Sequence, residues 1–294
     1  MENMPLVIFS GCMQAAIGIM FFVAIAKLFN KKGIYKTAVL GAGILAIIGL
    51  LASFLHLGRP LHAANAILHF GTSWLSREIW FSSIFAALTV ITALLILFKP
   101  SVKNAINVLI PITALIGIVD VYVMASIYYF ASVPAWNYGA VYVEFYAFAI
   151  STGAMIFYAL SFKDAANVQK MIAYVTAGIV TIQVVAMICY YVSLGDNSSL
   201  AAQQSISLLN NMDYAMVIKW LFILVGTAIP FVSIWEKRLR GPAMAETAKE
   251  VAAAVDTNNR ASVLYLAVAL LVIGQFVGRY IFYAIMVGTG VGLV

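Results

Sequence analysis

The sequence predicts an all-α integral membrane protein, folded as one bundle of eight transmembrane helices across residues 1–294. Apolar residues make up 64% of the chain and charged residues 10%, with a mean hydropathy of +1.01, which is too apolar for a soluble core wrapped in polar surface. Eight windows of about 20 residues carry few charges and are long enough to cross roughly 30 Å of hydrocarbon. Alternating short runs typical of membrane β-barrels are absent, so a helical bundle is expected.

The expected helices lie near residues 6–29, 37–57, 78–98, 104–130, 141–162, 168–193, 214–235 and 262–286. The first window has no basic n-region before it, so we expect it to be retained as a helix. A basic turn with Gly33 follows it. The second window ends at Gly58-Arg59-Pro60, because proline disfavours a helical residue before it. Ser76 is the expected N-cap of the third helix, with Glu78 in its first turn.

The remaining windows carry isolated polar residues. Asp120 lies near the middle of the fourth helix, and Glu144 near the start of the fifth. Residues 194–213 form a polar loop in which Leu200 to Leu209 is expected to make a short interfacial helix. Residues 236–261 read as a charged linker. Gly274 and Gly278 in the last helix are small residues that allow a neighbouring helix to approach closely.

Most lysines and arginines fall on one side of an eight-helix bundle, which the positive-inside rule makes cytoplasmic. The other side holds only Arg59, Arg77 and Lys219, near helix ends. Both termini and the loops 58–77, 131–140 and 194–213 are therefore expected to be periplasmic, in a bacterial inner membrane, and the linker 236–261 cytoplasmic. The net charge of +6 is explained by this loop distribution, so no nucleic-acid partner is expected.

The stretch from Ser53 to Trp80 is the predicted working site. It contains all three histidines, His56, His62 and His69, together with Arg59, Arg77 and Glu78. Ionisable groups beside a membrane core are costly and tend to be functional. The predicted topology brings His56, Glu78, Glu144, Arg279 and the turn at Trp136 to the outer face. Such a site suits quinol, whose oxidation releases two electrons and two protons, with a histidine and a carboxylate as proton acceptors.

Structural interpretations stand beside these functional ones. His56 at a helix C-terminus is equally suited to interact with the terminal carbonyl groups of that helix. Glu78 in a first turn is equally suited to act only as a helix cap. Arg59 and Arg77 equally suit lipid headgroups. Asp120 and Arg279 either pair with each other or line a pathway. His62 and His69 are expected to contact a partner, and Trp136 and Tyr283 equally suit membrane-interface anchors.

The sequence contains no signature of a bound redox centre or metal. The histidines belong to one outer segment and no CxxCH motif is present, so we expect no haem. Two isolated cysteines, Cys12 and Cys189, are too few for an iron–sulfur cluster, and no dinucleotide or phosphate motif occurs. A chain that oxidises quinol without such centres needs a partner subunit to take the electrons.

Several motifs resemble the membrane anchor subunit of anaerobic dimethyl sulfoxide reductase. These are Leu55-His56-Leu57-Gly58-x-Pro60 with Ala64-Asn65, Leu75-Ser76-x-Glu78-Ile79, Val133-Pro134-x-Trp136 and Gly278-Arg279-x-x-Phe282-Tyr283. The resemblance implies a haem-free anchor that binds menaquinol near the periplasmic face. It also implies an iron–sulfur subunit docked on that face and a molybdopterin catalytic subunit, together forming an oxidoreductase complex of anaerobic respiration on S- or N-oxides.

The resemblance gives the site residues their expected roles. His56 and Glu78 match the positions associated with quinol binding and oxidation. We add Arg59, Trp136, Arg279 and Tyr283 as quinol-binding residues. His62, His69 and Arg77 are expected to dock the partner.

Three alternatives remain at the level of the sequence. One is a polysulfide-reductase type of quinone-reactive anchor, and another is a purely structural tether. The third is a secondary transporter that uses Asp120 as its coupling residue, although inverted repeats and interrupted helices are not evident.

Overall fold

The computed structural model describes residues 3–30, 33–55, 67–162, 168–239 and 251–290. Within these ranges the chain forms nine α-helices and one short 3-10 helix, and no strand. The elements are α1 (Met4–Phe29), α2 (Lys36–Leu55), α4 (Trp74–Phe98), α5 (Lys103–Tyr129), η2 (Pro134–Trp136), α6 (Ala140–Leu160), α7 (Gln169–Gly195), α8 (Leu200–Asn210), α9 (Asp213–Leu239) and α10 (Val251–Ala284).

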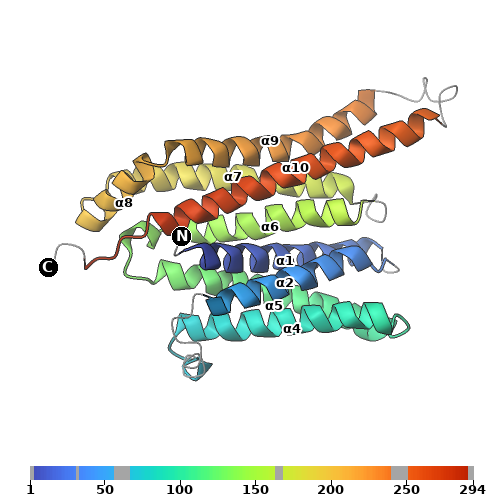
Figure 1. Cartoon of the computed structure of the whole chain (residues 1–294), viewed down its shortest axis with the longest axis horizontal. Helices are drawn as coiled ribbons and strands as arrows, with labels where there is room; N and C mark the ends of the chain where they lie inside the picture. Colours follow the sequence, from blue (N-terminus) through green and yellow to red (C-terminus); the bar gives the residue numbers. More distant parts are fainter. Residues whose placement is uncertain (1–2, 31–32, 56–66, 163–167, 240–250, 291–294) are drawn as a thin grey trace.

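Eight of the described helices are long and apolar enough to cross a membrane, which confirms the expected all-helical bundle. They lie roughly side by side (Figure 1), and α8 is the short helix expected between residues 200 and 209. The N-terminus, the described end of the chain, α8 and η2 all lie at one end of the bundle, which we call the termini end. Phe29, Phe98 and the starts of α2 and α5 lie at the opposite end.

Two of the expected helix boundaries differ from the structure. The N-cap of α4 is Ser73, whose hydroxyl accepts a hydrogen bond from the Ser76 amide at 3.4 Å. The prediction of Ser76 as the cap was wrong, and Glu78 lies in the second turn of α4, not the first. The apolar part of the helix begins at Trp74 and not at Glu78, so the cap lies one turn before the expected one, at Ser73.

The charged linker expected at 236–261 is shorter than the sequence indicated. Helix α9 continues to Leu239, and α10 begins at Val251. At 1.5 Å per residue, the 34 residues of α10 extend over about 51 Å, well beyond its apolar span Ser262–Ala284. The hydropathy pattern located only the apolar span, because the alanine-rich part before it favours helix without being apolar enough to enter lipid.

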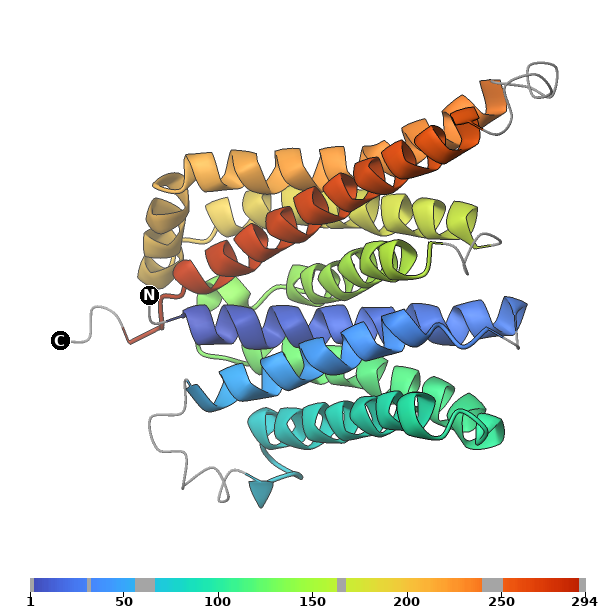
Figure 2. The same cartoon turned by 45° about the vertical axis from the view of Figure 1, so that its right-hand side comes forward.

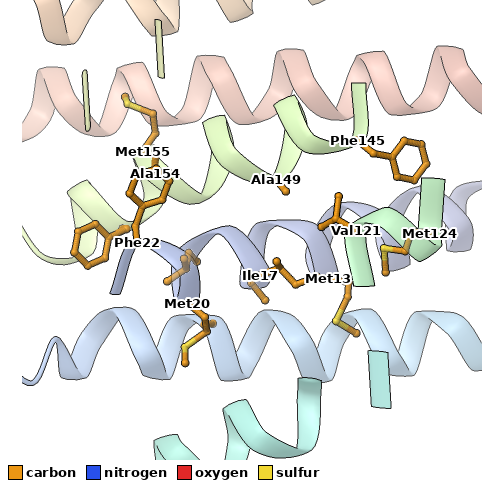
Figure 3. Packing of buried hydrophobic residues seen from close by; sticks show 14 of the residues in the cluster. Met13, Ile17, Met20, Phe22, Val121, Met124, Phe145, Ala149, Ala154 and Met155 are labelled. Atoms are coloured by element: carbon orange, nitrogen blue, oxygen red, sulfur yellow. The ribbon is translucent and has the colours of Figure 1, made fainter. Parts of the chain in front are cut away.

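Helix α1 lies at the centre of the bundle. It packs on α2, α5 and α6, and also contacts α10 and α4, so it joins an N-terminal group of helices to a C-terminal group formed by α6, α7, α9 and α10 (Figure 2). Met13, Ile17 and Met20 of α1 are fully buried. Met13 and Met20 point toward α2 (Figure 3), and Ile17 lies beside Gly117 of α5. Gly18 and Gly153 bring the backbones of α1 and α6 into direct contact, since a Cβ on either glycine would overlap backbone atoms of the other helix.

Candidate functional site

Glu78 is a buried carboxylate on α4 near the termini end. The residue is 7% exposed, and its carboxylate makes no hydrogen bond or ion pair with any other residue in the described part of the chain. Buried polar side chains are normally hydrogen-bonded, because burial without a partner is costly. An ionisable group buried beside a membrane core is costly, so Glu78 is a candidate for a functional role.

Asp120 of α5 lies against the same face of α4. One of its oxygens, Oδ2, accepts a hydrogen bond from Ser82 at 2.8 Å, while Oδ1 has no partner among the described residues. Ser82 follows Glu78 by four residues, so the two lie one above the other on the helix. Asp120 is within electrostatic range of Glu78, and the two buried carboxyl groups form an acidic pair between α4 and α5.

Arg279 of α10 is 1% exposed and lies inside the bundle. Its Nη2 donates to the Gln14 side chain at 2.6 Å, and its guanidinium carbon lies 3.7 Å from the Phe145 ring centroid. Nε and Nη1 have no hydrogen-bond partner within the described ranges. The structure thus joins Arg279 to Gln14, and no ion pair between Arg279 and Asp120 occurs among the described residues.

An aromatic cluster lies near both Glu78 and Arg279. The Tyr128 and Tyr283 hydroxyl oxygens are 2.9 Å apart, and Tyr283 also donates to Ser10 at 3.2 Å. Both Glu78 and Arg279 are within electrostatic range of Tyr128. A carboxylate without a described partner and a cation with two unpartnered nitrogens in the described part of the chain therefore lie around one pair of tyrosines.

Trp136 and Tyr283 are core residues and do not form an exposed interfacial belt. Trp136 is 5% exposed and Tyr283 2%. The Trp136 indole donates to the Phe282 carbonyl oxygen at 2.9 Å, and the two rings stack with centroids 5.1 Å apart. These contacts fix η2 onto α10 and close the termini end over the aromatic cluster.

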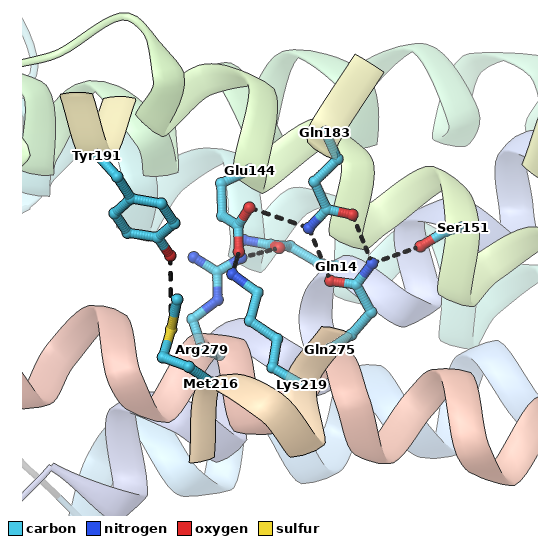
Figure 4. Close-up of polar contacts among 9 residues, drawn as sticks. All are labelled: Gln14, Glu144, Ser151, Gln183, Tyr191, Met216, Lys219, Gln275 and Arg279. Atoms are coloured by element: carbon cyan, nitrogen blue, oxygen red, sulfur yellow. Dashed lines mark hydrogen bonds and ion pairs between the residues drawn. The ribbon is translucent and has the colours of Figure 1, made fainter. Parts of the chain in front are cut away.

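A second polar network crosses the C-terminal group of helices (Figure 4). Lys219 of α9 forms a buried ion pair with Glu144 of α6, with 2.7 Å between Nζ and Oε1. The other oxygen of Glu144 accepts from Gln183 of α7 at 2.9 Å. Gln183 and Gln275 exchange hydrogen bonds, and Gln275 donates to Ser151 at 3.0 Å. The network links α6, α7, α9 and α10.

Lys219 was expected to lie at the outer end of a helix, and instead it is buried. It is 2% exposed, and its side chain passes over Gly278, where a Cβ would lie 2.7 Å from the Lys219 Cε. A small cavity of about 30 Å³, lined by Glu144, Lys219, Tyr190 and Tyr191, adjoins the pair. That volume suits one or two waters, so the cavity is too small for a quinone ring.

Comparisons with known proteins identify the family of this chain. The sequence profile of the family described as "DMSO reductase anchor subunit (DmsC)" matches residues 1–285. The chain belongs to the DMSO reductase anchor subunit family. Over 163 residues it is 34% identical to the C subunit of the anaerobic dimethyl sulfoxide reductase of Haemophilus influenzae, a match that covers 54% of this sequence but only 58% of that protein.

Two Escherichia coli proteins match over nearly their whole length. The anaerobic dimethyl sulfoxide reductase subunit YnfH is 25% identical over 299 residues, and the C subunit of that organism's anaerobic dimethyl sulfoxide reductase is 26% identical over 306. Each match covers 98% of this sequence and 96% of the relative. With eight apolar helices in its described ranges, this anchor subunit is a multi-pass protein of a bacterial inner membrane and belongs to an oxidoreductase complex.

The residues expected to dock a partner fall into two groups. His62 lies outside the described residues, as do the expected quinol-site residues His56 and Arg59. His69 is exposed in a turn at the termini end. Arg77 donates to the carbonyl oxygens of Phe70 at 3.0 Å and Gly71 at 2.7 Å, so it holds this turn against the start of α4.

The turn and α4 enclose an apolar groove of this anchor. Its volume is about 540 Å³, and it is lined by Ile67, Leu68, Phe70, Trp80, Phe81 and Ile84. The Trp80 indole donates to the Ile67 carbonyl oxygen at 3.1 Å, which fixes one wall. Ile67, Leu68 and Phe70, from the segment before α4, therefore form one wall of this groove.

Several network residues of this anchor were missed as site candidates. Gln14, Gln183 and Gln275 are glutamines inside apolar windows, and each is 1% exposed or less. A polar amide in a transmembrane window is a usable signal, because it must find a partner across a helix interface. No group of three or more potential metal ligands occurs within the described ranges.

Proposed function

We propose that this anchor subunit binds menaquinol near the termini end, which we infer to be periplasmic, and oxidises it there. The observation that carries the proposal is Glu78, a carboxylate 7% exposed with no hydrogen-bond partner among the described residues, on the helix that follows the histidine segment. Oxidation of a quinol releases two protons, and a buried base without a partner is suited to accept one of them.

The chemistry assigned to Glu78 is proton transfer. One quinol hydroxyl proton passes to the Glu78 carboxylate, and His56 takes the second in this proposal. Two electrons leave the ring as the carbonyl bonds form, so the balance is quinol to quinone, two protons and two electrons. The carboxyl group of Asp120, on the facing helix α5, lies within electrostatic range of Glu78.

Arg279 is proposed to donate to a quinone oxygen. Its Nε and Nη1 have no partner among the described residues, while Gln14 and the Phe145 ring fix the guanidinium. A donor and a base near the same tyrosine pair would orient a ring with an oxygen at each end. Trp136 and Tyr283 contribute walls of the site. Arg59 is proposed to contact the quinol ring as well, as expected from the sequence.

The apolar groove beside α4 offers a path from lipid. Its lining by Ile67, Leu68, Phe70, Trp80, Phe81 and Ile84 has no charged side chain, as an isoprenoid tail requires. The groove and Glu78 share α4. We infer that the tail lies in this groove while the ring is held farther inside.

In this proposal the electrons leave the chain, because its sequence carries no haem or iron–sulfur motif. We infer that an iron–sulfur subunit docks on the termini end and takes them one at a time, for delivery to a molybdopterin catalytic subunit. The exposed turn at His69, held by Arg77, belongs to the proposed docking surface, together with His62.

The decisive test compares Glu78→Gln with Asp213→Asn, an exposed acidic residue at the start of α9, in membranes that contain the assembled complex. Glu78→Gln is expected to lower quinol-dependent turnover by about 10²–10⁴-fold, and Asp213→Asn to leave it unchanged. Reduction of the terminal acceptor by an artificial dye donor reports on the partner subunits and is expected to stay normal in both variants.

Binding is measured separately from turnover. Quenching of a fluorescent hydroxyquinoline N-oxide, a menaquinol-like inhibitor, is expected to saturate at about one site per complex in the parent protein. Arg279→Gln is expected to weaken this binding without loss of assembled complex. Unchanged turnover in Glu78→Gln would refute the catalytic assignment, and absence of quenching in the parent would refute the quinol site.

A further inference from the structure

A second cavity lies at the opposite end of the bundle from the proposed quinol site. Its volume is about 470 Å³, and it is enclosed by the end of α1, the segment before α2, the end of α4 and the first turns of α5. The lining residues are Lys27, Ile34, Ile96, Pro100, Lys103, Asn104, Ile106 and Asn107. Two cations and two amides therefore share a cavity with three isoleucines.

The positive charge of this cavity is not neutralised within the described part of the chain. Lys27 donates to the Gly33 carbonyl oxygen at 2.9 Å, which uses one of its three N–H donors. Lys103 is exposed. The carboxylates whose side chains are described lie inside the bundle or toward the termini end, and the one ion pair among them involves Lys219. An anionic group is thus the complementary ligand.

The apolar surroundings decide which kind of anion fits. Ile96 and Ile106 are buried and line the cavity. Beside it, Leu28 is 77% exposed, Phe29 63% and Phe98 77%, and in a transmembrane bundle such side chains face lipid. An occupant with a phosphate at the lysines and acyl chains along these residues complements both the positive charge and the apolar surface. Inorganic phosphate complements only the positive charge.

We propose that this cavity binds the headgroup of an anionic phospholipid, with Lys27 and Lys103 contacting the phosphate and Asn104 and Asn107 its polar ester or glycerol oxygens. Basic pockets between transmembrane helices are suited to such headgroups. The bound lipid would join α1 to the α4–α5 turn. This inference is independent of quinol chemistry at the termini end.

The test uses the full-length protein purified in detergent, with bound lipid counted by native mass spectrometry during titration with phosphatidylglycerol or phosphatidylcholine. Phosphatidylglycerol is expected to saturate one tight site, and phosphatidylcholine is not. The double variant Lys27→Gln/Lys103→Gln is expected to bind phosphatidylglycerol roughly 30-fold more weakly, since each lysine near an anionic headgroup contributes about fivefold. Lys103→Gln alone is expected to lose about fivefold and serves if the double variant does not fold.

Lys170→Gln is the matched control, because Lys170 is an exposed lysine at the same end, on α7, and does not line the cavity. It is expected to bind phosphatidylglycerol as the parent does. Equal weakening in Lys170→Gln, full binding in the double variant, or equal binding of phosphatidylcholine would each overturn the proposal. Displacement of the lipid by millimolar inorganic phosphate would assign the site to a soluble anion and overturn it as well.

Discussion

The Glu144–Lys219 ion pair makes a quantitative prediction about the stability of the bundle. Lys219 is 2% exposed and Glu144 5%, and Lys219 is the only partner of the Glu144 Oε1 among the described residues. Lys219→Met removes that partner and leaves a buried carboxylate whose remaining described hydrogen bond is with Gln183. Removal of one member of a buried pair typically costs about 3–5 kcal/mol, because the remaining charge is not compensated.

Replacing both members is expected to cost much less. Glu144→Gln/Lys219→Met removes both charges of the pair, and an amide at position 144 still accepts from Gln183, so we expect a loss of about 1 kcal/mol. The coupling energy between the two sites is then about 2 kcal/mol or more. The assay is SDS-induced unfolding of the purified protein, measured for the parent, both single variants and the double variant.

Two outcomes of this cycle would contradict the role assigned to the ion pair. If the double variant loses as much stability as the sum of the single variants, the two groups act independently and the ion pair does not hold α6 to α9. If Lys219→Met alone costs less than about 1 kcal/mol, the site is better solvated than 2% exposure indicates. Gly278→Ala is a further control, because its Cβ would displace the Lys219 side chain and should reproduce part of the loss.

Three further predictions concern separate parts of the molecule. Gly18→Leu is expected to destabilise the protein by about 3 kcal/mol or prevent assembly, because the side chain would overlap the α6 backbone; unfolding midpoints measure this, and parent-like stability would contradict the close contact. Ser73→Ala is expected to cost about 1 kcal/mol through loss of the α4 cap, with faster hydrogen exchange confined to the first turn. Gln14→Leu is expected to weaken inhibitor binding by roughly tenfold, since Arg279 loses its only described hydrogen-bond partner; unchanged binding would show that Gln14 does not position Arg279.

Much of the architecture followed from the sequence alone. The eight spans, the short helix near residue 200 and the family were all predicted from hydropathy and local motifs. These features depend on neighbouring residues, since about 20 apolar residues in a row are sufficient to specify a membrane helix. The limits of α4 and α10 were less well predicted, because helix propensity and capping extend a helix beyond its apolar part.

The pairing of polar side chains was decided only by the tertiary structure. Gln14 meets Arg279 across 265 residues, and Glu144 meets Lys219 across 75. In these helices both the lipid-facing and the buried sides are apolar, so the sequence carries little periodic signal of which face points inward. Whether a charge is at the membrane surface, as expected for Lys219, or inside the bundle depends on the rotation of its helix. That rotation is set by contacts such as Gly278 against Lys219, which exist only once the helices have packed.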